Sequence, residues 1–75
     1  MKLVKVKEGE IFRYKDHGWG YSVHTPLLRG RIASDSSSFV MVRCYENIVD
    51  KSKSVLIPGN AEVVVIGRVY KNHKQ

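Results

Sequence analysis

The sequence predicts an all-β domain, a small barrel of five or six strands with at most one short helical turn. Residues 61–70 hold four valines, an isoleucine and a tyrosine, which suit a pleated and buried backbone. Similar short runs recur along the chain between tight turns, with almost no helical signal. The 75 residues are too few for an immunoglobulin-type sandwich, which needs about 100 residues. A small barrel is therefore the expected architecture.

The N-terminal part predicts a strand followed by a hairpin. Residues 2–7 alternate lysines with apolar side chains, which indicates an edge strand whose lysines hinder pairing with other chains. Residues 10–15 also alternate and place both of their aromatic side chains on one face. Two glycines mark a loop over 16–20, and strand spacing resumes beyond it, so we expect a hairpin over 10–24.

The middle of the chain predicts a second hairpin, after a proline that interrupts the ladder. Residues 27–33 form its first arm, and alternation places Arg29 and Arg31 on the same face, about 7 Å apart. A serine-rich turn spans 34–38, and residues 39–45 form the second arm.

The last third predicts two strands around a Pro-Gly-Asn turn. Residues 46–52 fit either a loop or one helical turn. Residues 54–57 form a short strand, and the turn then leads into 61–70. This last strand is apolar at every position over 63–66, so we expect it to be central and covered on both faces. Gly67 marks a bulge or a close backbone approach.

Length and cysteine content predict one domain over 1–75, with 71–75 as a frayed tail. Cys44 is the single cysteine, so no internal disulfide forms, which fits a reducing cytoplasm. No apolar run approaches the roughly 20 residues of a membrane helix, and the first residues do not form a signal peptide. We therefore expect a cytoplasmic protein with no membrane partner.

Two sets of motifs resemble known families. The first set is a Gly-x-x-Phe opening at Gly9 and Phe12, a Val-x-Cys strand at Val42 and Cys44, and a closing Glu-Val-Val at 62–64. It resembles small SH3-like barrel proteins of phages and bacteria, which implies an SH3-like barrel and little about chemistry. This chain differs from that pattern by an insertion over 27–38.

The second resemblance covers only 55–70, where Ile66-Gly67-Arg68-Val69 is similar to the closing strands of the LexA and phage-repressor peptidase fold. That family uses a nucleophilic serine after Gly-Asp, and this chain has no Gly-Asp-Ser. The resemblance therefore implies a non-catalytic scaffold.

Residue chemistry argues against an enzyme. Cys44 lies mid-strand on an apolar face, where a thiol is buried and inert. The histidines are His17, His24 and His73, and no set of three or four ligands completes a zinc site. The acidic residues are scattered, with no pair suited to acid–base catalysis. We expect no catalytic residue, no metal and no cofactor.

Charge and arginine placement instead favour a binding protein. The chain carries 13 Lys and Arg against 7 Asp and Glu, a net charge of +6 that attracts polyanions or acidic proteins and also promotes solubility. All five arginines fall within predicted strands, and Trp19 lies at a loop tip. Aromatic residues lie near two of the arginines: Phe12 and Tyr14 flank Arg13, and Tyr45 comes two positions after Arg43. The expected binding residues are Arg13, Trp19, Arg29, Arg31, Arg43 and Arg68.

Two functions fit this pattern. The first is binding of nucleic acid, DNA or RNA, with arginines on phosphates and an aromatic ring stacked on a base. The alternative is a small phage-type adaptor or inhibitor that docks on an acidic surface of a larger host protein. For the aromatics the competing interpretation is the core, and for Trp19 it is a lid over the barrel. The sequence does not fix the oligomeric state.

Overall fold

Five antiparallel strands make up one sheet in the computed structural model, which describes residues 1–16, 20–35, 40–48 and 52–69. Apart from one 3-10 turn this part of the chain is all-β, which confirms the expected fold class, and it has no helix able to cross a membrane. The elements are η1 (Leu3–Lys5), β1 (Glu10–Tyr14), β2 (Leu27–Asp35), β3 (Val40–Tyr45), β4 (Ser54–Pro58) and β5 (Val63–Arg68).

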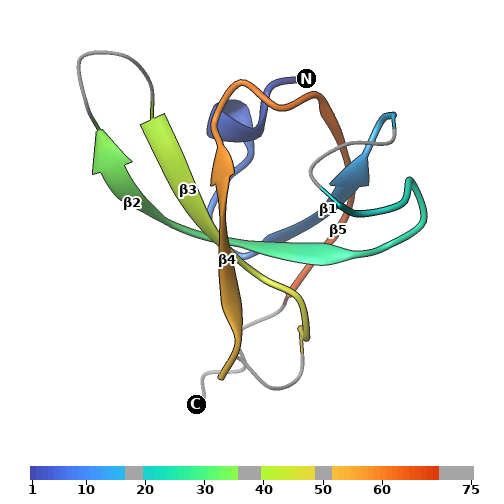
Figure 1. The fold of residues 1–75 in the computed structure, drawn as a ribbon. Helices are drawn as coiled ribbons and strands as arrows, with labels where there is room; N and C mark the ends of the chain where they lie inside the picture. The colour runs from blue at the N-terminus through green and yellow to red at the C-terminus, as the bar shows by residue number, and fades with distance from the viewer. Residues whose placement is uncertain (17–19, 36–39, 49–51, 70–75) are drawn as a thin grey trace.

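The strands are hydrogen-bonded in the order β4-β3-β2-β1-β5. Figure 1 shows the sheet strongly curved, with β2 running from the side of β1 and β5 to the side of β3. The concave side holds the core, in which β1 and β3 bury alternate residues. The core residues are Leu3, Val6, Phe12, Tyr14, Leu27, Val42, Cys44, Ile57, Ala61 and Val63.

The expectation that residues 61–70 form a central strand is wrong, because β5 lies at one end of the strand order. Val63 is fully buried and Val65 packs against the core, but Ile66 is 48% exposed. Where β5 pairs with β1 the register shifts: Gly67 opposes Ile11 and Val65 opposes Phe12, which leaves Ile66 as an extra residue. This confirms the bulge expected at Gly67.

The N-terminal segment is a 3-10 turn and not the expected strand. Leu3 and Val6 are three residues apart, so one turn of this helix points both side chains into the core, where they are at most 1% exposed. The backbone N–H of Leu3 donates to the carbonyl of Ala61 at 2.9 Å, and that of Val4 donates to Gly59 at 2.8 Å. These bonds fasten the segment across the connection between β4 and β5.

The expected hairpin over 10–24 is also wrong, because β1 pairs with β2 and β5. The connection from β1 to β2 runs over 15–26, and residues 17–19 of it lie outside the described part. Tyr21 packs against the core, with its ring centroid 6.0 Å from that of Tyr14. The spacing of Tyr21 and Val23 that suggested a strand therefore occurs in a loop, which packs Tyr21 against the core.

The strands expected in the middle of the chain are confirmed. β2, β3 and β4 occupy the predicted strand positions, and β2 extends two residues further than expected. Residues 46–48 and 52 are not helical, whereas 49–51, most of the predicted serine turn and the tail over 71–75 lie outside the described residues.

Gly30 allows β2 and β3 to approach each other more closely than a larger residue would permit. A Cβ atom placed on Gly30 would lie 2.6 Å from the carbonyl oxygen of Arg43 and 2.9 Å from Cε2 of Tyr45. The backbone oxygen cannot move without breaking the β2–β3 ladder. Glycine is therefore required at this position on steric grounds.

We predict that Gly30→Ala destabilises the protein by roughly 2 kcal/mol or more, because the added methyl group overpacks the β2–β3 contact. Gly67→Ala is the matched control, since the nearest atom to its Cβ would be Cδ1 of Ile11 at 3.9 Å. The control should change stability by less than about 0.5 kcal/mol. Urea denaturation of both variants measures the difference, and equal stabilities would contradict the close approach.

Candidate functional site

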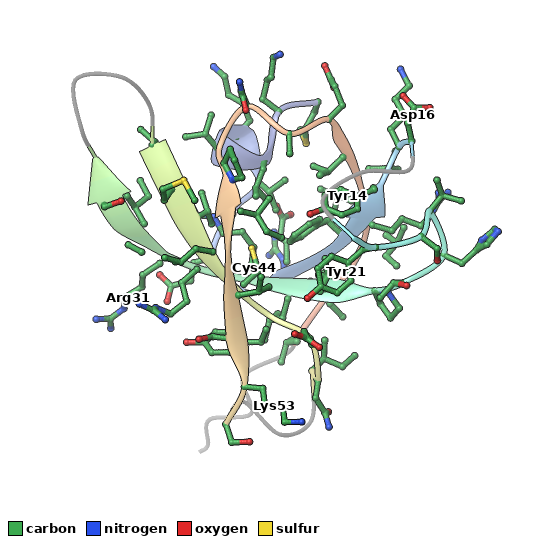
Figure 2. The ribbon with its side chains drawn as sticks, viewed as in Figure 1. Tyr14, Asp16, Tyr21, Arg31, Cys44 and Lys53 are labelled. Carbon is green, nitrogen blue, oxygen red and sulfur yellow. The ribbon has the colours of Figure 1, made fainter. Side chains whose placement is uncertain are left out.

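A bulge in β2 brings two exposed arginines together on neighbouring strands. Arg29 pairs with Cys44 and Ile32 pairs with Val42, so Gly30 and Arg31 together oppose the single residue Arg43. Adjacent strands lie about 4.8 Å apart, so the two side chains leave the sheet as neighbours. Figure 2 shows Arg31 pointing away from the ribbon, whereas Cys44 lies on the concave side.

Tyr45 belongs to the same surface, because residues two apart on a strand share a face. Tyr45 is half-buried and pairs with Leu28 of β2 and Ser54 of β4. We name Arg31, Arg43 and Tyr45 the basic face.

The basic face borders a shallow groove of about 390 Å³ between the turn before β1 and the ring of Tyr45. Buried Leu28 and Gly30 contribute to its lining, and Arg31 and Glu8 stand at its rim as exposed side chains. The complete lining is Glu8, Gly9, Leu28, Arg29, Gly30, Arg31 and Tyr45, which we name the Tyr45 groove.

The two arginines of the basic face have different partners. Nε of Arg31 lies 3.6 Å from Oε2 of Glu8, with the two side chains 87% and 58% exposed. Nη1 of Arg43 donates to the hydroxyl of Ser54 at 2.9 Å, which leaves its charge without a counter-charge among the described residues. An exposed ion pair of the Arg31–Glu8 kind is weak, so an incoming anion can replace the carboxylate.

Arg29 does not belong to the basic face, and the expectation that it shares an exposed face with Arg31 is wrong. Arg29 is only 8% exposed, because it pairs with Cys44 ahead of the bulge and the alternation then breaks. Its Nη1 donates to the carbonyl of Gly30, and its Nε is buried without a partner in the described part of the chain. Changing Arg29 would therefore disturb the interior, contrary to the behaviour expected of an exposed strand position.

Arg13 and Arg68 are not gathered at the basic face. Nη1 of Arg13 donates to the carbonyl of Val23 at 3.3 Å, which fastens the loop between β1 and β2. Arg68 lies on β5, separated from β2 by β1, with Nη2 3.5 Å from Oε2 of Glu10. The backbone N–H of Lys7 and the charge of Arg68 hold the pKa of Glu10 below its usual value.

Trp19 lies outside the described residues, so the structure does not place it. Of the residues now on the basic face, sequence reasoning noted Tyr45 only as an aromatic two positions after Arg43. That spacing was the signal for a shared strand face. No sequence signal identified Glu8 as the partner of Arg31, because their contact depends on the β2 bulge.

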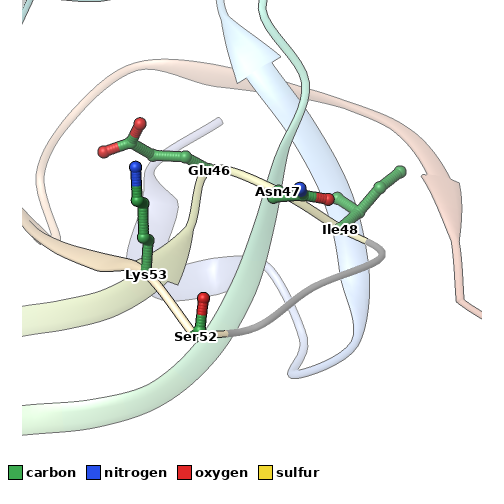
Figure 3. Close-up of a pocket in the computed structure, with 5 residues that line it drawn as sticks. All are labelled: Glu46, Asn47, Ile48, Ser52 and Lys53. Carbon is green, nitrogen blue, oxygen red and sulfur yellow. The ribbon is translucent and has the colours of Figure 1, made fainter.

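A second hollow, about 510 Å³ in volume, lies where β3 turns toward β4. Figure 3 shows the amino group of Lys53 and the carboxylate of Glu46 pointing toward each other there. Opposite charges at one rim do not favour a polyanion, so we do not place the binding site in this hollow. Its lining is Glu46, Asn47, Ile48, Ser52 and Lys53.

The interior holds titratable groups in their neutral forms. Burial raises the pKa of the Cys44 thiol to about 12, and the thiol is fully buried, as expected of a structural cysteine. Burial, with the nearby Glu46 carboxylate, raises the pKa of Tyr21 to about 12. Burial also raises the pKa of Tyr14, whose hydroxyl has no hydrogen-bond partner among the described residues.

No three His, Cys, Asp or Glu side chains of the described part of the chain gather closely enough to hold a metal ion. The thiol of Cys44 donates only a weak bond to the carbonyl of Val42, at 3.7 Å. The basic face offers two exposed guanidinium groups and a half-buried aromatic ring.

The raised pKa of Cys44 predicts a loss of stability in alkaline solution. The unfolded thiol titrates near pH 9 and the folded thiol near 12, so between these values the folded state holds the extra proton. Stability is therefore fully present below pH 9 and falls as the pH rises through this window. At pH 10 the titration of Cys44 has lowered the free energy of unfolding by about 1–2 kcal/mol.

Urea midpoints at pH 7 and pH 10 for the wild type and Cys44→Ala measure this loss. Any cavity in the variant affects both pH values and cancels in the comparison. The variant should lose less stability between the two pH values. An equal loss would show that the thiol is not protected in the folded state.

Comparisons of the chain with protein-family models, with curated proteins and with solved structures find no match. The function therefore has to be inferred from the residues themselves, and the basic face is the group of exposed side chains best suited to bind a partner.

Proposed function

We propose that this chain is a non-catalytic protein that binds nucleic acid through Arg31, Arg43 and Tyr45. The observation that carries the proposal is the β2 bulge, which sets Arg31 opposite Arg43 beside an aromatic ring. Arginine donates to phosphate oxygens through a planar fork, and aromatic rings stack on bases. The net charge of +6 adds long-range attraction for a polyanion.

The arrangement resembles a small SH3-like barrel in that five short antiparallel strands curve around one core. We propose the cytoplasm as its compartment, because the single cysteine is buried and unpaired, as suits a reducing environment. DNA and RNA remain equal candidates, since phosphate contacts are common to both.

A second candidate function is docking on an acidic protein surface. Leu56 is 44% exposed and pairs with Arg43 across β3 and β4, and half-buried Met41 and Pro58 pair on the same face. Exposed apolar side chains beside an arginine suit a protein partner as well as a nucleic acid. Capture of partners from lysate with and without nuclease separates the two: a stoichiometric protein retained after nuclease favours docking.

We predict that the double variant Arg31→Ala/Arg43→Ala keeps its fold and binds oligonucleotides roughly tenfold more weakly, with a salt slope reduced by about two phosphate contacts. Fluorescence anisotropy with labelled oligonucleotides over a range of salt concentrations measures both quantities. The matched control is Lys5→Ala/Lys15→Ala, which removes two exposed positive charges outside the basic face. Equal losses in the two double variants would mean that only net charge matters, and no wild-type binding at low salt would overturn the proposal.

We predict that Glu8→Gln strengthens oligonucleotide binding about two- to fivefold, because Arg31 no longer has to leave an ion pair. Asp16→Asn is the control, since it changes the net charge equally and Figure 2 shows Asp16 on the opposite side of the molecule from Arg31. The same titration measures both variants. An equal gain in both would show that Glu8 does not compete for the site.

A further inference from the structure

The Tyr45 groove has the features of a pocket for a flat ring beside a phosphate-binding surface. Leu28 and Gly30 in its lining are buried and uncharged, buried Arg29 lies between them in sequence, and the ring of Tyr45 closes one side. The ring lies against β2 because Gly30 has no side chain, with Cε2 only 2.9 Å from where a Cβ would be. Arg31 stands at the rim and belongs to both the groove and the basic face.

Only an unpaired base can use such a groove. The bases of a duplex are stacked on one another, and a protein reaches only their edges. A single strand can turn a base out, and stacking of that base on an aromatic ring adds affinity for every kind of base. Phosphates on either side of the base would then lie near Arg31 and Arg43.

We infer that the Tyr45 groove takes one unpaired base of a single-stranded nucleic acid, stacked against Tyr45, while Arg31 and Arg43 hold the neighbouring phosphates. This inference rests on the proposed function and adds the class of nucleic acid to it. Selectivity for single strands comes from Tyr45 and the groove, whereas the arginines attract single and double strands alike.

The test uses three ligands of equal phosphate number on the wild-type protein: a single strand of about 30 nucleotides, a duplex of about 15 base pairs, and an abasic single strand of about 30 nucleotides. We expect the base-bearing single strand to bind about tenfold more tightly than the other two at the same salt concentration. Fluorescence anisotropy measures the three affinities and needs no variant.

Variants of Tyr45 then assign the selectivity to the ring. Tyr45→Phe keeps the ring and should keep the preference, and Tyr45→Leu should reduce binding of the single strand to the level of the abasic strand without changing the latter. Thermal melting establishes whether both variants fold. If Tyr45→Leu does not fold, the comparison of the three ligands on the wild type still tests the inference.

The outcomes separate this inference from the proposed function. If all three ligands bind equally, or the duplex binds most tightly, the groove takes no base, while the arginine interface stands. If none of them binds at low salt, the proposed function and this inference both fail. If the preference persists undiminished in folded Tyr45→Leu, the stacking role of Tyr45 is wrong.

Discussion

The close approach of β2 and β3 at Gly30 determines where every residue of the basic face lies. The carbonyl of Arg43 occupies the space that a side chain at position 30 would need. Two residues of β2 then face one residue of β3, and the alternation of β2 changes at this point. Leu27 to Gly30 are buried in succession, and Arg31 is the first exposed residue after them. The same missing side chain lets Tyr45 lie low over the sheet.

Local charge pairing decides which cations remain available to a partner. Glu62 interacts with the amino group of Met1 and with Lys2, and Glu10 interacts with Arg68. These exposed pairs contribute little to stability, but they reduce the positive field at that end of the sheet. Arg43 lies on the opposite side of β2, and its bond among the described residues is to the neutral hydroxyl of Ser54, which does not offset its charge. The net charge alone would not have indicated this asymmetry.

Much of the fold could be predicted from the sequence, because alternation reports which side of a strand is covered. Phe12 and Tyr14 are buried as their spacing predicted, and so are Val42 and Cys44. Alternation failed at Arg29, because a bulge changes the register and depends on a contact with another strand. It also failed for 2–7, where Leu3 and Val6 are buried by a helical turn docked on residues distant in sequence.

The candidate site was predictable only in part, for the same physical reason. The sequence identified arginines within strands and an aromatic residue near Arg43, but pairing between strands decides which of them meet. The strand of valines was misplaced because an apolar run indicates burial without indicating neighbours. Ile66 occupies a bulge at the end of the sheet, where its side chain is exposed despite the apolar surroundings in sequence.

The bonds between the N-terminal segment and the residues around β5 also constrain how the protein folds during synthesis. Leu3 donates to Ala61, and β1 pairs along the whole length of β5, so the first and last elements of the sheet depend on each other. The sequential strands β2, β3 and β4 can pair as soon as they leave the ribosome, since their contacts are local. Synthesis adds about 5–20 residues per second, so several seconds pass between the synthesis of β1 and that of β5. During this time one edge of β1 is unpaired. Lys2 and Lys5, in and beside η1, give this early intermediate a positive charge that hinders pairing of its open edge with other chains.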